Sequence, residues 1–356
     1  MTTLRLPEDP PFTTLVGVGG IGGGMFLALE GDATLGREES RGAHLLDVRD
    51  ACKLHIVAHH VAVLLGAAPS GAPFHVVPVG RVGADETGRR LIDEMRAAGM
   101  DTSRVGTVEG VPTLFSVCFQ YPDGSGGNLT TTGSAAATLT EADVDRVAAL
   151  LEPRTIALAA PEVGIGPRRR LLELATERGA FRAVSLTSAD LEDARASGLL
   201  GLADLLALNE DEAAILAGFR LSDDMPAPFL DAVAAALEAG HTGMRIVVTA
   251  GARGAFAFEG GRWDHRPSPG VELRSTAGAG DALLGGVLSA LAAGVPLIDP
   301  SAPDGTLGCA LDLGVALAAL SVTSPHTIYP TVDLETVLTF AEGTGLALRP
   351  PLADVV

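Results

Sequence analysis

The chain has 356 residues, of which 44 are acidic (Asp and Glu) and 25 are basic (Lys and Arg), so its formal charge is −19 with histidines neutral. Apolar residues make up 47% of it, enough for a large core, which excludes disorder as the main state. The acidic balance excludes nucleic acid and anionic membranes as expected partners, because clustered Lys and Arg side chains bind phosphate groups. We therefore expect a small-molecule ligand.

The compartment is predicted from cysteine usage and hydropathy. Three scattered cysteines, Cys52, Cys118 and Cys309, form no disulfide framework and indicate a reducing environment. The N-terminal residues show no signal pattern, and the longest apolar stretch, Ala282 to Ile298, contains glycines and a proline and is too short to span a bilayer. We expect a soluble, cytoplasmic protein.

Short β-rich runs alternate with longer helical patterns along the chain. The N-terminal half predicts, in order, a strand Thr14–Val18, a helix Asp50–Leu65, a strand His75–Val79, a helix Glu86–Ala98, and strands Leu114–Gln120 and Leu129–Thr132 around a turn at Pro122, Asp123 and Gly124. The rest predicts a strand Thr155–Ala159, a helix Pro167–Arg178, strands Ala183–Leu186 and Leu205–Leu208, helices Glu210–Ala217 and Asp231–Ala239, and a strand Arg245–Thr249. Asp85 is the expected N-cap of the helix that ends before Gly99.

Such alternation predicts an α/β fold with a mostly parallel central sheet and helices on both faces. The stretch between Gly106 and Gly133 interrupts the alternation with short strands, and such a small β excursion from the main layer is a natural lid.

A glycine-rich segment carries the clearest chemical signal. Ser275-Thr276-Ala277-Gly278-Ala279-Gly280-Asp281 precedes a helical pattern of Leu284, Val287, Leu288 and Leu291. Backbone N–H groups at a helix start form an anion site, and a carboxylate beside it is well placed to take a proton from a hydroxyl that attacks a phosphoryl group. The alternative interpretation is an aspartate that only stabilises the helix start.

Three further segments occur in a fixed order with this one. They are the run from Val79 to Gly88, which leads to Ala98-Gly99-Met100-Asp101-Thr102, then Asn209-Glu210-Asp211-Glu212, and then Val247 to Gly254. Together the four resemble the motifs of the ribokinase-like (phosphofructokinase-B type, PfkB) sugar kinase family. The resemblance runs from about residue 14 to residue 335.

The resemblance implies a single three-layer kinase domain over residues 1–356, with a small β-sheet lid contributed by about 24–48 and 107–134. It implies ATP-dependent phosphorylation of a hydroxyl on a sugar, nucleoside or similar small molecule, with Mg²⁺, and a homodimer formed through the lid. In it Asp281 is the base, and Gly278, Ala279 and Gly280 form the anion hole. The expected nucleotide-side residues are Asn209, Glu212, Thr249, Gly251, Arg253, Gly254 and Thr276, with Glu212 acting on Mg²⁺ through water. Asn209 and Glu212 also fit a plain helix cap.

The acceptor side departs from the family pattern. Gly19 to Gly24 matches G-x-x-x-x-D without the carboxylate, and Cys52 to Val57 lacks the glycines and asparagine of G-G-x-x-x-N. The predicted acceptor residues are Gly20, Gly22, Gly24, Lys53, His55, His59 and Phe115. Lys53, the only lysine, and the two histidines suggest an acceptor with an anionic or aromatic group. Ser275 replaces the first aspartate of the family's D-T-T-G-A-G-D, which speaks against potassium dependence.

Three alternatives remain open. Cys52, His55 and His59 have a spacing that fits one helix face and could bind Zn²⁺, although no fourth ligand is evident. Gly17 to Gly22 fits G-x-G-x-x-G, as in an NAD-dependent dehydrogenase, but glycines interrupt the helix that this fingerprint needs. Loss of the acceptor motifs also fits a kinase-fold protein that binds a ligand or regulates without turnover.

Overall fold

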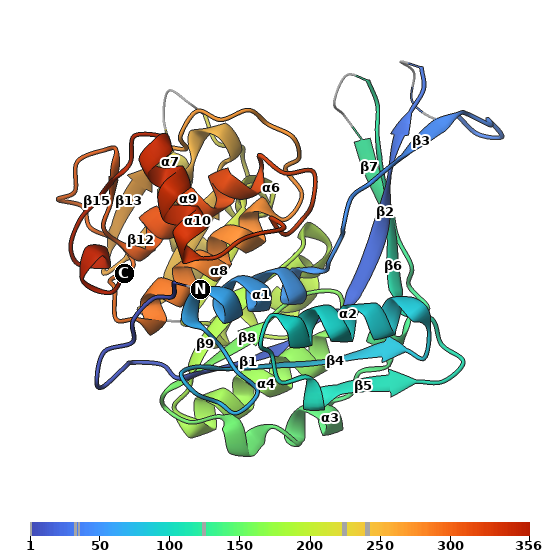
Figure 1. The fold of residues 1–356 in the computed structure, drawn as a ribbon, viewed down its shortest axis with the longest axis horizontal. Coiled ribbons are helices and arrows are strands. Elements are labelled where there is room, and N and C mark those ends of the chain that lie inside the picture. The colour runs from blue at the N-terminus through green and yellow to red at the C-terminus, as the bar shows by residue number, and fades with distance from the viewer. Residues whose placement is uncertain (1, 32–33, 35, 123–125, 223–225, 239–242) are drawn as a thin grey trace.

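A nine-stranded sheet forms the centre of the protein (Figure 1). The structure, a computed structural model, describes residues 2–31, 34, 36–122, 126–222, 226–238 and 243–356. In spatial order the strands are β13 (Arg262–Arg266), β12 (Ala255–Glu259), β11 (Arg245–Thr249), β10 (Leu205–Asn209), β9 (Phe181–Ser185), β8 (Thr155–Ala159), β1 (Thr14–Val18), β4 (His75–Gly83) and β5 (Val105–Val108). The strands from β11 to β5 run parallel, and β12 and β13 continue the sheet antiparallel.

Helices cover both faces of this sheet, as predicted. One face packs against α1 (Lys53–Leu65), α2 (Glu86–Ala97), α8 (Ala279–Ala292), α9 (Ala310–Ser321) and α10 (Leu334–Gly343). The other packs against α3 (Glu141–Asp145), α4 (Ile165–Arg178), α5 (Leu191–Ala196), α6 (Glu210–Ala217) and α7 (Pro226–Glu238). Successive residues of β1 point to opposite faces, so Leu15 joins the first core and Val16 the second. Both are fully buried. Strands covered on both sides have long apolar runs, which is why β1 and β8 are readable in the sequence.

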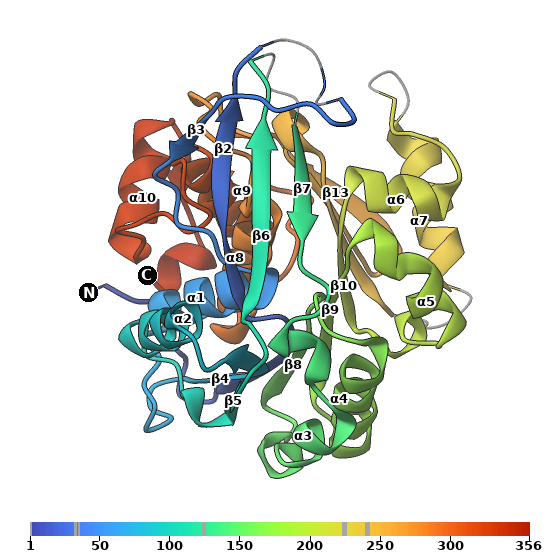
Figure 2. The same cartoon turned by 90° about the vertical axis from the view of Figure 1, so that its right-hand side faces the viewer.

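A second sheet stands away from the body and corresponds to the predicted lid (Figures 1 and 2). We call it the lid sheet: its strands, in spatial order, are β3 (Ala43–Leu46), β2 (Gly22–Leu29), β6 (Leu114–Gln120) and β7 (Gly126–Thr130). The strands β2 and β6 pair in parallel, from Gly22 with Leu114 to Ala28 with Gln120. The lid sheet begins at Gly22, slightly before the predicted boundary at about residue 24. The glycines at positions 22 to 24 therefore form the start of strand β2.

Several predicted boundaries differ from the structure. The helix expected from Asp50 begins at Lys53, because the backbone of Cys52 is extended, with φ −73° and ψ 161°. The N–H groups before the helix bond to distant partners: Ala51 donates to Thr327 Oγ1 at 3.0 Å and Cys52 to Gly22 O at 3.3 Å. The last lid strand ends at Thr130, two residues early, and α7 begins five residues before Asp231.

Some predicted positions cannot be compared, and one predicted cap agrees with the structure. Ala239, the predicted end of that helix, and Asp123 and Gly124 of the predicted lid turn, fall outside the described residues. Asp85 caps α2 as predicted, its Oδ1 accepting from Gly88 N at 2.8 Å.

The strand order indicates the edge of the main sheet at which a ligand is expected to bind. From β1 the chain proceeds through α1 to β4 on one side, whereas β8 continues through α4 to β9 on the other. Ligands bind outside the carboxyl ends of the strands where the order reverses in this way. Across the part of the chain that the structure describes, no helix has the length and apolar character to cross a membrane.

Candidate active site

The start of α8 forms the centre of the site. Gly278 caps it with φ 79°, and a Cβ atom at this position would lie 2.6 Å from the Thr327 carbonyl oxygen, so only glycine fits without displacement. The helix begins at Ala279, and its first N–H groups have no partner within the helix. Asp281 lies in this first turn and is 7% exposed. The predicted anion hole and base are therefore adjacent, at the positive end of the helix dipole.

Lys53 reaches Asp281 from the first turn of α1, which packs against α8. Its Nζ lies 3.6 Å from Asp281 Oδ1. The carboxylate charge of Asp281 raises the pKa of Lys53, with further contributions from Glu212 and Glu162. Burial raises the pKa of Asp281, and the Lys53 ammonium opposes that rise. The sequence predicted Lys53 as an acceptor contact, and the structure places its charge against the predicted base.

Glu162 is a site residue that the sequence analysis missed. It follows β8 with φ 71°, an unusual conformation for a residue with a side chain, and its Oε2 is buried with no hydrogen-bond partner among the described residues. Burial, and then the charge of Asp281, raise the pKa of Glu162 to about 7. The available signal was its position just beyond the carboxyl end of a buried parallel strand.

Asn209 and Glu212 form a reciprocal cap at the start of α6. Asn209 Oδ1 accepts from Glu212 N at 2.8 Å, while Glu212 accepts from Asn209 N at 2.8 Å and from Asn209 Nδ2 at 2.9 Å. The helix-cap interpretation therefore describes the local structure. Glu212 is also 3% exposed, and burial raises its pKa while the Lys53 charge opposes the rise. Both glutamate oxygens already accept hydrogen bonds, so the residue fits contact with Mg²⁺ through water.

The Thr249–Gly254 turn lies beside this cap, because Thr249 pairs with Asn209 at the end of the sheet. A Cβ atom on Gly280 would lie 3.7 Å from Thr249 Oγ1, which places the turn next to the anion hole. Arg253 pairs with Glu210 in this turn. Two positive-φ glycines, Gly251 and Gly254, shape it. Thr276 lies three residues before Ala279, and its carbonyl oxygen accepts a hydrogen bond from Ala279 N at 3.3 Å.

The three acceptor-side glycines are close contacts of the lid sheet and its base. A Cβ atom on Gly20 would lie 2.4 Å from Glu162 Cβ, one on Gly22 would lie 2.6 Å from Leu114 O, and one on Gly24 would lie 2.4 Å from Asp50 Oδ2. Since β2 starts at Gly22, the segment lacks the helix that a dinucleotide fingerprint requires. Strand alternation puts Phe115, paired with Gly23, on the opposite lid face from Gly24.

The predicted histidines of α1, His55 and His59, lie on other sides of the helix than Lys53. His55 follows Lys53 by two residues, about 200° around the helix axis, and is 1% exposed. Neither of its ring nitrogens has a hydrogen-bond partner within the described part of the chain. Burial lowers the pKa of His55 to about 4, with a further contribution from the charge of Arg90. His59 is partly buried next to it, with ring centroids 6.3 Å apart. The described residues contain no group of three His, Cys, Asp or Glu side chains that could hold a metal ion, so the structure does not support the zinc hypothesis.

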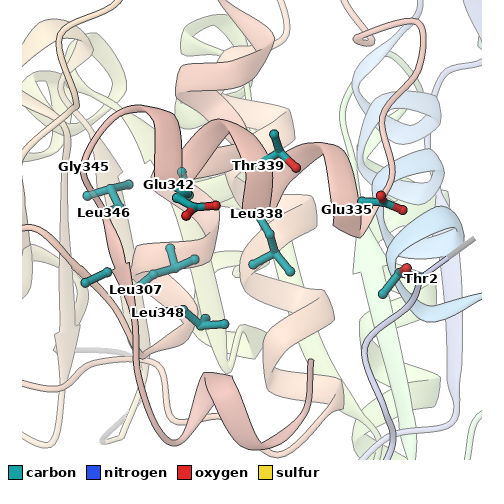
Figure 3. A pocket seen from close by; sticks show the side chains of 11 residues that line it. Thr2, Leu307, Glu335, Leu338, Thr339, Glu342, Gly345, Leu346 and Leu348 are labelled. Atoms are coloured by element: carbon teal, nitrogen blue, oxygen red, sulfur yellow. The ribbon is translucent and has the colours of Figure 1, made fainter.

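A separate cavity of about 570 Å³ lies near the C-terminus, between α10 and β15 (Ala347–Leu348) (Figure 3). Leu338, Leu346 and Leu348 line it together with Glu335 and Glu342. It contains none of the residues described above, so the chemistry of the α8 site does not extend to it.

The parallel sheet, the lid sheet and a glycine-capped helix start with a buried aspartate in its first turn define the class of ribokinase-like α/β kinases. The chain belongs to the pfkB family of carbohydrate kinases, whose sequence profile matches residues 57–334. It is 26% identical over 243 residues to the ribokinase of Haemophilus influenzae, covering 68% of this chain and 73% of that protein.

Solved structures share the fold. A putative ribokinase II from E. coli in complex with ATP and Mg²⁺ is similar with a TM-score of 0.70 and 17% identity, covering 93% of this chain and 100% of that one. Aminoimidazole riboside kinase from Salmonella enterica, complexed with aminoimidazole riboside and an ATP analogue, is similar with a TM-score of 0.64 and 18% identity, covering 92% and 99%.

Proposed function

We propose that the protein transfers the γ-phosphoryl group of ATP to a hydroxyl of a sugar, nucleoside or sugar-like small molecule. The observation that carries this proposal is the buried Asp281 carboxylate in the first turn of α8, three residues after Gly278 and 3.6 Å from the Lys53 ammonium. Family membership and the ATP bound in two structural neighbours support the choice of donor.

The nucleotide side fits a magnesium–triphosphate. The glycine at 278 leaves room that a side chain would fill, and the helix start offers N–H donors to an anion. The carboxylate of Glu212 would hold Mg²⁺ through water, and the ion would neutralise part of the triphosphate charge. The net charge of −19 makes backbone donors important, because Arg253, the basic side chain of the nucleotide turn, is paired with Glu210.

In the proposed reaction Asp281 accepts the proton of the acceptor hydroxyl as its oxygen attacks the γ-phosphorus. A new phosphorus–oxygen bond forms, the bond to the β-phosphate oxygen breaks, and ADP leaves with the electron pair of that bond. The backbone N–H groups of the anion hole, Gly278 to Gly280, stabilise charge on the transferring group, and that of Ala279 exchanges its bond to Thr276 O for one to the phosphoryl oxygen. Lys53 favours the ionised form of Asp281 before transfer, since its ammonium opposes the rise in the pKa of that carboxyl caused by burial.

Replacement of Asp281 by asparagine tests the function. We expect ADP formation with an acceptor panel of sugars and nucleosides to fall by roughly 10²–10⁴-fold, while ADP binding followed by calorimetry stays within about twofold. Glu86→Gln is the matched control, since Glu86 is an exposed acid in the first turn of α2. A native protein that binds nucleotide but phosphorylates no acceptor would instead favour the regulatory alternative.

The proposal also includes a cytoplasmic location and a homodimer. All three cysteines are free, which supports a reducing compartment such as the cytoplasm. The two outer strands of the lid sheet carry exposed leucines, which supports a homodimer formed through the lid.

A further inference from the structure

The carboxylate of Asp50 occupies an unusual position at the base of the lid sheet. Asp50 is partly buried in the extended segment just before α1. Its Oδ2 lies where a side chain on Gly24 would begin, since a Cβ atom on Gly24 would be 2.4 Å from it. Gly24 is the position at which the family motif predicts an aspartate, so a carboxylate fills that volume from a different segment.

The lid sheet itself explains why strand β2 cannot supply this carboxylate. A Cβ atom on Gly24 would also lie 2.6 Å from the carbonyl oxygen of Ser116 on the paired strand β6. Backbone atoms of a sheet cannot yield as a flexible side chain can. Any residue with a side chain at position 24 would therefore disrupt the β2–β6 pairing, and only glycine leaves room for the Asp50 carboxylate.

Asp50 and Lys53, whose side chain contacts the proposed base Asp281, lie at two ends of one short segment. Asp50 precedes Lys53 by three residues, so their Cα atoms are at most about 10 Å apart, and Lys53 contacts Asp281. Burial raises the pKa of the Cys52 thiol, and the charges of Glu162, Asp50 and Asp281 raise it further, so all three carboxylates act on this residue. The start of α1 therefore links the Asp50 carboxylate to the site of the proposed base.

The Asp50 carboxylate has capacity for a ligand. Across the described residues, no arginine, lysine or histidine forms an ion pair with it, and the nearby Arg90 instead donates to Glu94 Oε1 at 2.8 Å. Burial raises the pKa of Asp50 to about 6, which leaves the group mostly ionised above neutral pH. An ionised carboxylate only accepts hydrogen bonds, and its two oxygens suit hydroxyl donors.

The charges of the site select among acceptors. Three carboxylates, those of Asp50, Glu162 and Asp281, surround the start of α1, whereas Lys53 brings one ammonium group already paired with Asp281. A second anion would be repelled here, whereas hydroxyl groups would satisfy the carboxylate oxygens. We propose that Asp50 binds a hydroxyl group of the acceptor and that the acceptor is an uncharged polyhydroxy molecule. This inference rests on the proposed phosphotransfer function and revises the anionic acceptor suggested by the sequence.

The test uses the full chain with D-ribose, D-fructose and adenosine as uncharged probes, and D-ribose 5-phosphate as the anionic one. ADP release gives KM for each probe and for ATP in the native protein, Asp50→Asn and Asp50→Ala. Asp47→Asn is the matched control, because Asp47 is an exposed carboxylate of the same segment. Thermal melting and ADP binding check that each variant is folded, and Asp50→Asn keeps the side-chain shape should Asp50→Ala fail to fold.

We expect both Asp50 variants to raise KM for the preferred uncharged probe at least tenfold, with KM for ATP within twofold and Asp47→Asn unchanged. For a deoxy form of that probe, which lacks the bound hydroxyl, KM should be similar in the native protein and in the Asp50 variants. A merely structural role of Asp50 would not produce this difference between the two probes. An unchanged acceptor KM in folded Asp50→Asn, or a preference of the native protein for ribose 5-phosphate, would overturn this inference alone. Absence of native turnover with every probe would overturn the proposed function together with it.

Discussion

Replacing Lys53 by methionine removes the positive charge closest to the proposed base and keeps a side chain of similar length. Since the ammonium stabilises the ionised form of Asp281, its loss raises the pKa of that carboxyl. The base must be ionised to accept a proton, so the variant should lose activity first at low pH. The acid limb of the pH–rate profile should therefore move to higher pH.

The distance sets the size of this shift. Nζ and Oδ1 are 3.6 Å apart, and opposite unit charges at about 4 Å attract by about 4 kcal/mol at an effective dielectric constant of about 20. One pH unit in a titration midpoint corresponds to about 1.4 kcal/mol. Glu212 and Glu162 share the ammonium, so only part of the attraction acts on Asp281. If a third of it does, the midpoint moves up by about one pH unit.

The assay measures ADP release between pH 5.5 and 9 at saturating ATP, for native protein, Lys53→Met and Lys53→Arg. Lys53→Arg retains a positive charge and should shift the midpoint less. Arg49→Met is the matched control, since Arg49 is an exposed cation four residues earlier. A folded Lys53→Met variant with normal ADP binding and an unchanged midpoint would refute the proposed charge coupling.

Two further predictions concern stability and assembly. The pKa of His55 is about 4 in the folded protein and 6.5 ordinarily. As pH falls below 6.5, His55 therefore binds a proton in the unfolded chain but stays neutral in the folded protein. The free energy of unfolding falls as a result, by up to about 3 kcal/mol at pH 4. His55→Leu should remove this share of the acid destabilisation in urea melts at pH 7, 5.5 and 4.5, and an unchanged pH dependence would contradict the assignment. On the lid sheet, Leu45 and Leu129 are 70% and 67% exposed, and the strand register puts them on one face. Light scattering should show that the native protein is a dimer and that Leu129→Lys weakens this dimer. The control Leu348→Lys, at an exposed site near the C-terminus, should leave the dimer unchanged. A native monomer would exclude the lid dimer.

The sequence by itself determined the architecture and one half of the proposed site. Buried parallel strands such as Thr155–Ala159 are continuous apolar runs, and helix Glu210–Ala217 carries its capping residues within four positions, so local patterns suffice to place them. The nucleotide side follows the same rule, since Gly278 and Asp281 belong to one turn and their relation is fixed by helix geometry.

Only the tertiary structure decided the acceptor side. Asp50, Glu162 and Asp281 are separated by more than a hundred residues each, and their proximity depends on how α1 packs against α8 and on the contact between Gly24 and Ser116. Lys53 could be recognised as an unusual residue, but its partner could not, because the spacing of residues along the chain carries no information about which side chain faces another across a packed interface. The missing aspartate of the family motif indicated a lost site, whereas the fold restores a carboxylate to the same volume from a different segment.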